Sequence, residues 1–129
     1  MVNVLVNNFS GAYREQGFLS WLQGKDTTIR CLDWEGLAGC CCYCDAQAAE
    51  TICRALPTEL PRLRFLDSGD YHYMTLLLAL REPEPFHLLL LDHHPDDQAP
   101  AFGGVLSCGS WVRDMREGNV PLLSVLGVG

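Results

Sequence analysis

The sequence has no long apolar run and few basic residues. A helix that crosses a bilayer needs about 20 consecutive apolar residues, whereas the amino-terminal run at 2–6 is far shorter and lacks the basic leader of a signal peptide. Lys and Arg together number nine, they are scattered, and the formal net charge is -7. Binding to nucleic acid requires clustered cations that neutralise phosphates. We therefore expect a cytoplasmic protein that binds neither membranes nor nucleic acid.

Cysteine is abundant, but the sequence lacks a complete zinc-binding motif. Four of the seven cysteines lie at 40–44, where Cys41-x-x-Cys44 matches half of a zinc knuckle or a redox pair. No further C-x-x-C or H-x-x-x-H follows at zinc-finger spacing. An odd number of cysteines without a signal peptide indicates reduced thiols. We interpret the cluster as small residues that pack at a turn into a helix, with redox or zinc chemistry as the alternative.

The composition and the hydrophobic pattern predict one α/β domain over 1–129. Hydrophobic residues make up 48% of the chain and charged residues only 19%, which is enough apolar material for a core. Apolar runs predict strands at 2–9, 27–34, 63–67, 86–92 and 121–126. Capping residues and stop signals predict helices at 18–23, 46–56, 71–81 and 110–116. Such alternation is typical of a mostly parallel sheet with helices on both faces.

A cluster of carboxylates and imidazoles directly follows the leucine-rich strand at 86–92. Ligands in open α/β sheets bind at the carboxyl ends of strands. If the extended conformation continues, Asp92, His94 and Asp96 point to one side, and His93 and Asp97 point to the other. Carboxylates with a neutral imidazole suit Mn²⁺, with Zn²⁺ or Fe²⁺ possible. The alternative is an ordinary loop in which Asp side chains bond the local backbone.

Three segments resemble motifs of the arginase (ureohydrolase) superfamily. The pattern Asp92-x-His94-x-Asp96 resembles its D-A-H-x-D signature, in which all three residues bind a dinuclear manganese centre. The segment 64–73 is similar to a strand followed by G-G-D-H-S, with Tyr71 as an extra residue before His72. The segment 106–129 resembles the family's H-G-T/S motif, helix and closing strand. Taken together, the three segments are most similar to an arginase-like branch of the superfamily whose substrate is not settled.

The resemblance implies a fold, a cofactor and a reaction. The fold would be the three-layer αβα arrangement that arginases share with deacetylases. The cofactor would be Mn²⁺, two ions in a completed site, and the reaction would be hydrolysis of a linear C–N bond in a small guanidino or amide substrate. The implied metal ligands are His72, Asp92, His94 and Asp96, and the supporting residues around them are Asp70, His93 and Asp97.

Two departures from the family pattern limit this expectation. Cys108 stands where the family has a histidine that moves protons, and a thiol that titrates at about 8.5 is a poor substitute near neutral pH. No D-x-D-x-x-D motif, which would complete the two-metal site, occurs in the chain. We therefore expect the amino-terminal part of the fold, with half of the dinuclear site and poor catalysis. A non-catalytic metal-binding remnant or interaction module, and a zinc-dependent deacetylase-like enzyme, stay open as alternatives.

The incomplete resemblance also implies a partner. The predicted strand at 121–126 would lie at a sheet edge, and unpaired strand edges recruit other strands. We therefore expect self-association, or association with a complementing chain, through this edge and the apolar face beside it.

Overall fold

The computed structural model describes residues 1–24 and 26–129, which form a mixed α/β structure. Its strands are β1 (Val2–Asn8), β2 (Thr27–Asp33), β3 (Tyr43–Cys44), β4 (Leu63–Phe65), β5 (Phe86–Leu91), β6 (Leu106–Ser107) and β7 (Leu122–Val128). Its helices are α1 (Ala12–Glu15), α2 (Phe18–Gln23), α3 (Ala46–Ala55), α4 (Met74–Ala79), α5 (Trp111–Glu117) and the 3₁₀ turn η1 (Gly69–Tyr71). None of the described helices is long and apolar enough to cross a membrane.

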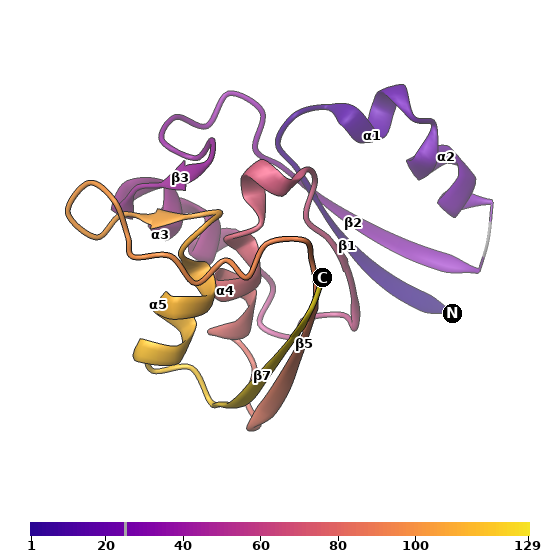
Figure 1. The fold of residues 1–129 in the computed structure, drawn as a ribbon. Coiled ribbons are helices and arrows are strands. Elements are labelled where there is room, and N and C mark those ends of the chain that lie inside the picture. The colour runs from indigo at the N-terminus through magenta and orange to yellow at the C-terminus, as the bar shows by residue number, and fades with distance from the viewer. Residues whose placement is uncertain (25) are drawn as a thin grey trace.

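The amino-terminal sheet has the order β2-β1-β4, and both pairings are parallel. Alternation along β1 sends its apolar side chains into two clusters. Val4 and Val6 pack with Leu22 of α2, whereas Leu5 joins a larger cluster that contains Ile52 of α3. Figure 1 shows α1 and α2 beside this sheet. Burial on both faces explains why Val4, Leu5 and Val6 at the centre of β1 are all apolar.

The strands β5 and β7 form a separate parallel pair. Leu90 belongs to the large core cluster together with Leu77 of α4 and Met115 of α5. The side chains of the opposite face, Leu89, Leu91, Leu126 and Val128, are exposed. In the part of the chain that the structure describes, helices therefore cover one face of this pair, whereas the sequence predicted helices on both faces of one sheet.

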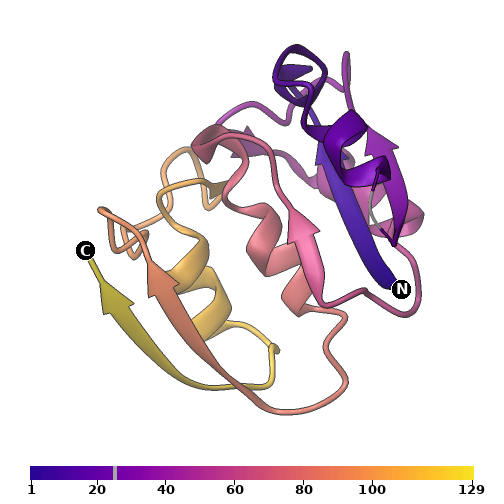
Figure 2. The same ribbon diagram turned by 90° about the vertical axis from the view of Figure 1, so that its right-hand side faces the viewer.

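No backbone pairing joins β4 to β5 among the described residues. A groove of about 610 Å³ lies between them, and its lining includes Leu63, Leu78, Phe86 and Leu88. Figure 2 shows β4 and β5 running in the same direction on either side of α4. Their carboxyl ends therefore lie at the same end of the molecule, which is where the polar residues that follow them come together.

Most predicted elements are confirmed within one or two residues, and Asp45 caps α3 as expected by accepting a 2.8 Å hydrogen bond from the Ala48 backbone N–H. The predicted helix at 71–81 is shorter, because η1 occupies 69–71 and α4 begins only at Met74. The antiparallel pair β3 and β6 and the short helix α1 were not predicted. Each has only two to four residues, too few to show a period.

Candidate metal centre

Two chain segments at the carboxyl ends of β4 and β5 bring three metal-ligand side chains together. His72 lies in the connection between η1 and α4, where its backbone N–H donates to the Gly69 carbonyl at 3.1 Å. Asp92 and Asp96 lie in the loop after β5. One ligand atom from each of the three side chains falls within 4.8 Å of the others. Parallel strands with polar residues just past their ends commonly build ligand sites in this way.

The imidazole of His72 faces both carboxylates through one nitrogen. Its Nδ1 lies 3.0 Å from an oxygen of Asp92 and 2.9 Å from an oxygen of Asp96. Two carboxylate oxygens around one ring nitrogen require a proton or another cation between them. Ligands at right angles around an ion with bonds of about 2.1 Å are about 3.0 Å apart. The two distances from His72 Nδ1 thus fit a divalent ion that has the imidazole next to each carboxylate in its coordination shell.

Trp111 fixes the most buried of these carboxylates. Its indole N–H donates a 2.7 Å hydrogen bond to Asp96 Oδ2, the oxygen that also faces His72. The Trp111 ring is completely buried and lies 4.9 Å from the His72 ring, centroid to centroid. Asp96 is only 7% exposed and adopts a left-handed backbone with φ of 49°. Such a conformation is tolerated by Asp better than by most residues, and here it turns the carboxylate inward.

Asp92 is held by the backbone of its own loop. Its Oδ1 accepts a 2.9 Å hydrogen bond from the His94 N–H, and its backbone N–H extends the sheet by donating to the Val128 carbonyl at 3.1 Å. The hydrogen bond from His94, together with the nearby charge of His72, lowers the pKa of Asp92. The carboxylate is therefore ionised at neutral pH.

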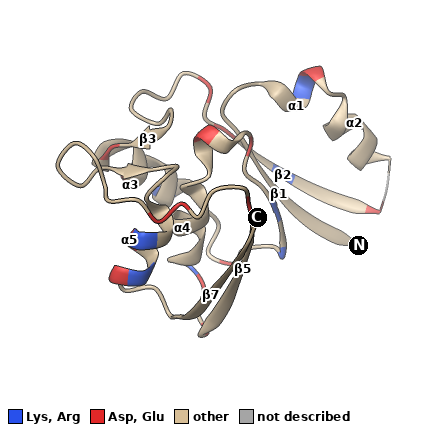
Figure 3. Cartoon of the chain, in the orientation of Figure 1, with Lys and Arg blue, Asp and Glu red and all other residues tan. Residues whose placement is uncertain are grey.

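Figure 3 shows acidic residues on η1 and on the loop after β5, with basic residues on α5.

The loop after β5 is also tied to α5. The backbone carbonyl of Asp96 accepts a 3.1 Å hydrogen bond from the Val112 N–H, and the Gln98 N–H donates to the Gly109 carbonyl at 3.0 Å. A loop held at both ends keeps its side chains in place before any ion arrives, which lowers the entropic cost of binding. The ligand geometry is therefore largely preformed.

His94 does not join the group formed by His72 and the two carboxylates. Its side chain is 77% exposed, and its Nδ1 is 3.8 Å from Asp92 Oδ1. The extended alternation that predicted a shared face for 92, 94 and 96 is wrong, because β5 ends at Leu91 and the chain then turns. His93 is exposed as well, with its ring 5.5 Å from that of His94.

The other two expected supporting residues lie outside the centre. Asp97 points toward α5, where its Oδ1 is 3.1 Å from a guanidinium nitrogen of Arg116. Asp70 forms a separate group with Cys41 and Cys42. The sequence predicted both carboxylates as supporting residues of the centre, because residue type and spacing do not show which way a side chain points.

A cleft of about 390 Å³ opens over the centre. Its lining contains all three clustered residues together with His94, Cys108 and Gly109. Burial, with Asp96 and Asp70 nearby, raises the pKa of the Cys108 thiol. Cys108 is therefore protonated at neutral pH and offers no base to a molecule in the cleft.

The comparisons with known proteins leave the family open. The chain is similar to an uncharacterised protein of Thermotoga maritima, with 34% identity over 58 residues. The aligned segment covers 45% of this chain and 22% of that relative. No family model matches the sequence, and no solved structure matches it. The residues of the site are therefore interpreted from their own geometry and from the resemblance of the motifs.

Proposed function

We propose that the protein binds a divalent metal ion, Mn²⁺ by preference, through His72, Asp92 and Asp96, in an arginase-like α/β domain. The observation that supports this is the placement of His72 Nδ1 within 3.0 Å of oxygens from both carboxylates. One imidazole and two carboxylates favour Mn²⁺, Fe²⁺ or Zn²⁺ over the harder Ca²⁺. His94 would serve as a further ligand only after rotating inward from its exposed position.

The reaction proposed for a completed site is hydrolysis of a linear C–N bond in a small guanidino or amide compound. When bound, divalent ions of this kind make hydroxide available near neutral pH and polarise the group under attack. The role of this chain's other residues is to orient the metal ligands. Trp111 fixes Asp96, and the His94 backbone N–H fixes Asp92. The cleft over the centre would admit the substrate.

The same observations favour a second candidate, a metal-binding domain that does not turn over substrate. Three ligands from this chain gather in one group among the described residues, and the thiol of Cys108 occupies the cleft wall. Two ions need bridging carboxylates beyond Asp92 and Asp96. We therefore propose that this chain binds metal, and that efficient hydrolysis depends on further carboxylates. A zinc-dependent deacetylase-like site would use the same three donors with one ion.

Mn²⁺ binding tests the proposal directly. The affinity would be measured by calorimetry and by the loss of the free Mn²⁺ resonance signal, for the wild type and for Asp92→Asn and His72→Ala. We expect each variant to bind at least about 100-fold more weakly, since loss of an outer partner alone costs about 10–100-fold. Asp114→Asn on α5 is the matched control, because that carboxylate bonds Ser110 rather than the centre.

Either of two results would overturn it. One is the absence of binding by the wild type after loading with Mn²⁺, Zn²⁺ or Fe²⁺. The other is an unchanged affinity in Asp92→Asn. Catalysis is followed separately, as urea or ammonia release from guanidino compounds and as deacetylation of an acetyl-lysine peptide.

A further inference from the structure

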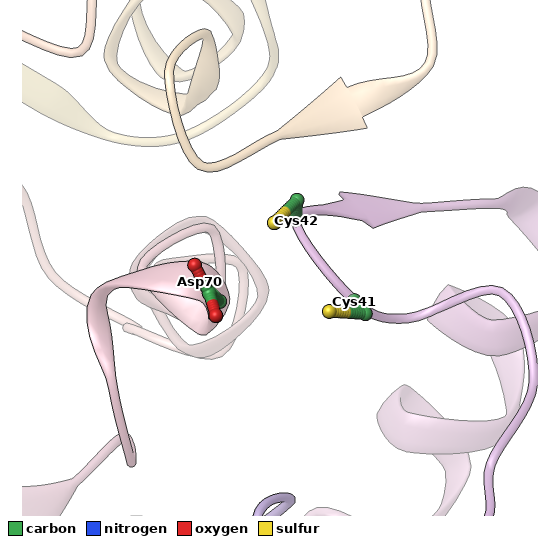
Figure 4. Close-up of side chains that lie close together, drawn as sticks. All are labelled: Cys41, Cys42 and Asp70. Carbon is green, nitrogen blue, oxygen red and sulfur yellow. The ribbon is translucent and has the colours of Figure 1, made fainter.

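We propose that Cys41, Cys42 and Asp70 form a second metal site, specific for a thiophilic ion such as Zn²⁺. One sulfur atom from each cysteine and one carboxylate oxygen lie within 4.8 Å of one another. Figure 4 shows these side chains turned toward the space between the cysteine loop and η1. The site is independent of the function proposed above, since it shares no ligand with His72, Asp92 and Asp96.

The backbone of Cys42 explains how two adjacent cysteines reach the same side. Successive side chains of an extended segment point in opposite directions. Cys42 instead has a left-handed conformation with φ of 59°, directly before β3. The turn at this residue brings its sulfur round to the side that carries the Cys41 sulfur. A left-handed non-glycine residue costs free energy and is often found at functional sites.

Backbone hydrogen bonds hold the two halves of the site together. The Cys42 N–H donates to the Asp70 carbonyl at 3.1 Å, which joins the cysteine loop to η1. The Cys42 carbonyl in turn accepts a 2.9 Å hydrogen bond from the Cys108 N–H, next to the β3 and β6 pair. The spacing of the three donors is therefore set by main-chain contacts from three separate segments. It does not depend on the side chains alone.

The neighbouring cysteines have other roles, which separates them from the site. The Cys40 thiol donates to the Leu37 carbonyl at 3.0 Å, and the Cys44 thiol lies 3.8 Å from the Asp45 carbonyl. Both residues are buried in the core. Cys41, in contrast, is exposed, and Cys42 is half-buried. An ion can reach the Cys41 and Cys42 sulfurs from solvent, whereas Cys40 and Cys44 serve packing.

The donor set determines the class of ion. Thiolates bind Zn²⁺, Fe²⁺ and Cu⁺ in preference to Mn²⁺, Mg²⁺ or Ca²⁺. Each thiol gives its proton to solvent as its bond to the ion forms. Three protein ligands leave a fourth tetrahedral position for water or a small molecule. The chain would thus carry two centres of different softness, one for a thiophilic ion and one for a harder ion.

Titration of the reduced 129-residue chain with Co²⁺ tests this proposal. Cobalt substitutes for zinc, and bonds from sulfur to cobalt give a charge-transfer band in the near ultraviolet. We expect the band in the wild type and in Asp92→Asn, because the latter lacks only the harder centre. Cys41→Ser with Cys42→Ser should abolish it, and Asp70→Asn should weaken Co²⁺ binding at least about tenfold. Competition with Zn²⁺ should bleach the band stoichiometrically.

The matched control is Cys31→Ser, which removes an exposed thiol on β2 and should leave the band unchanged. Far-ultraviolet circular dichroism verifies that each variant is folded. The proposal is overturned if the folded wild type gives no band, if the band persists in the folded double variant, or if Cys31→Ser removes it. Loss of Mn²⁺ binding with retention of the cobalt band would reject only the function proposed above.

Discussion

The indole N–H of Trp111 donates a 2.7 Å hydrogen bond to the same Asp96 oxygen that faces the His72 imidazole at 2.9 Å. The donor comes from the first turn of α5, and the acceptor comes from the loop after β5. Both groups are buried, so water does not compete with the bond. Trp111 therefore orients a candidate ligand and also joins the site to the helix that packs beneath it.

Removing only this hydrogen bond should weaken metal binding. Trp111→Phe keeps an aromatic ring in the core but removes the donor to Asp96. We expect the Mn²⁺ affinity to fall by about 10–100-fold, because partners that orient ligands typically contribute that much. The measurement is calorimetric titration of the folded variant.

The control for this prediction is Trp34→Phe. The Trp34 indole N–H also donates to a buried side chain, the Asn7 amide oxygen at 3.2 Å, but it lies outside the metal centre. Both variants lose one buried donor bond, so both should lose stability. Equal loss of Mn²⁺ affinity in the two variants would contradict the role assigned to Trp111.

Asp67 should make the stability of the fold dependent on pH. Its carboxylate accepts from the backbone N–H groups of Phe9 and Ser10, at 2.7 and 2.9 Å, and from the Ser10 hydroxyl at 2.7 Å. Burial raises the pKa of Asp67, but the hydrogen bonds from Ser10 and Phe9 outweigh it, so the pKa is lowered overall. The contact joins the end of β1 to the end of β4.

The sign of the effect follows from the lowered pKa. A group that is more acidic in the folded state stabilises the fold at pH values above its unfolded pKa, about 3.9. This contribution is lost as the pH falls through the folded-state pKa. Asp67→Asn should lower the free energy of unfolding by about 1–3 kcal/mol at pH 7. The difference from the wild type should shrink below about pH 4.

Urea denaturation across a pH series measures this dependence. Asn is a suitable replacement because Asp67 has φ of 73°, which Asn tolerates about as well as Asp. Glu59→Gln, at an exposed position, serves as the surface control. A difference between wild type and Asp67→Asn that stays constant from pH 7 to pH 3 would exclude the charge as its cause.

The sequence predicted the strands and the segments that carry the candidate metal centre, but it did not predict the detailed geometry of that centre. The leucine-rich run before Asp92 indicated a strand and placed carboxylates at its end. His72 was identified only through the resemblance to arginases. The grouping of Asp96 with Asp92 does not arise from alternation, because the chain turns through a left-handed Asp96.

Other features depend on contacts that are distant in sequence. No local pattern shows that the indole of Trp111 reaches Asp96, 15 positions earlier in the chain. The grouping of Cys41 and Cys42 with Asp70 requires η1 to lie beside the cysteine loop. Neither the turn at Cys42 nor this contact has a signature in the sequence.

Restoring a histidine at position 108 should not produce an efficient hydrolase. Cys108 lines the cleft over the centre, so Cys108→His would place an imidazole beside His72 and Asp92. General acid or base groups contribute about 10²–10⁴-fold to rates, but only when the reacting species is already formed. Because the second set of carboxylates is missing from the sequence, we expect no marked gain. The measurement is urea release from guanidino compounds by the Mn²⁺-loaded variant. Robust turnover by the wild type, or by Cys108→His alone, would contradict this.

The exposed face of the β5 and β7 pair should drive self-association. Leu91 is 75% exposed and Leu126 is 63% exposed, and Leu89 and Val128 lie on the same face. Contiguous apolar surface of this kind is typical of interfaces. The outer edge of β7 also carries no partner strand among the described residues. A second copy can cover both the face and the edge. The net charge of -7 opposes association, so raising the salt concentration should strengthen it by screening.

A charge placed on that face should keep the protein monomeric. Leu126→Lys introduces an ammonium group whose burial in an interface would be costly, and we expect at least about tenfold weaker association, which corresponds to about 1.4 kcal/mol. Leu80→Lys is the matched control, because Leu80 is 51% exposed at the end of α4 and gives the same change in charge. Light scattering and sedimentation at tens of micromolar protein, across a salt series, measure the effect. A wild type that stays monomeric at every salt concentration would rule out this interface, and so would equal weakening in both lysine variants.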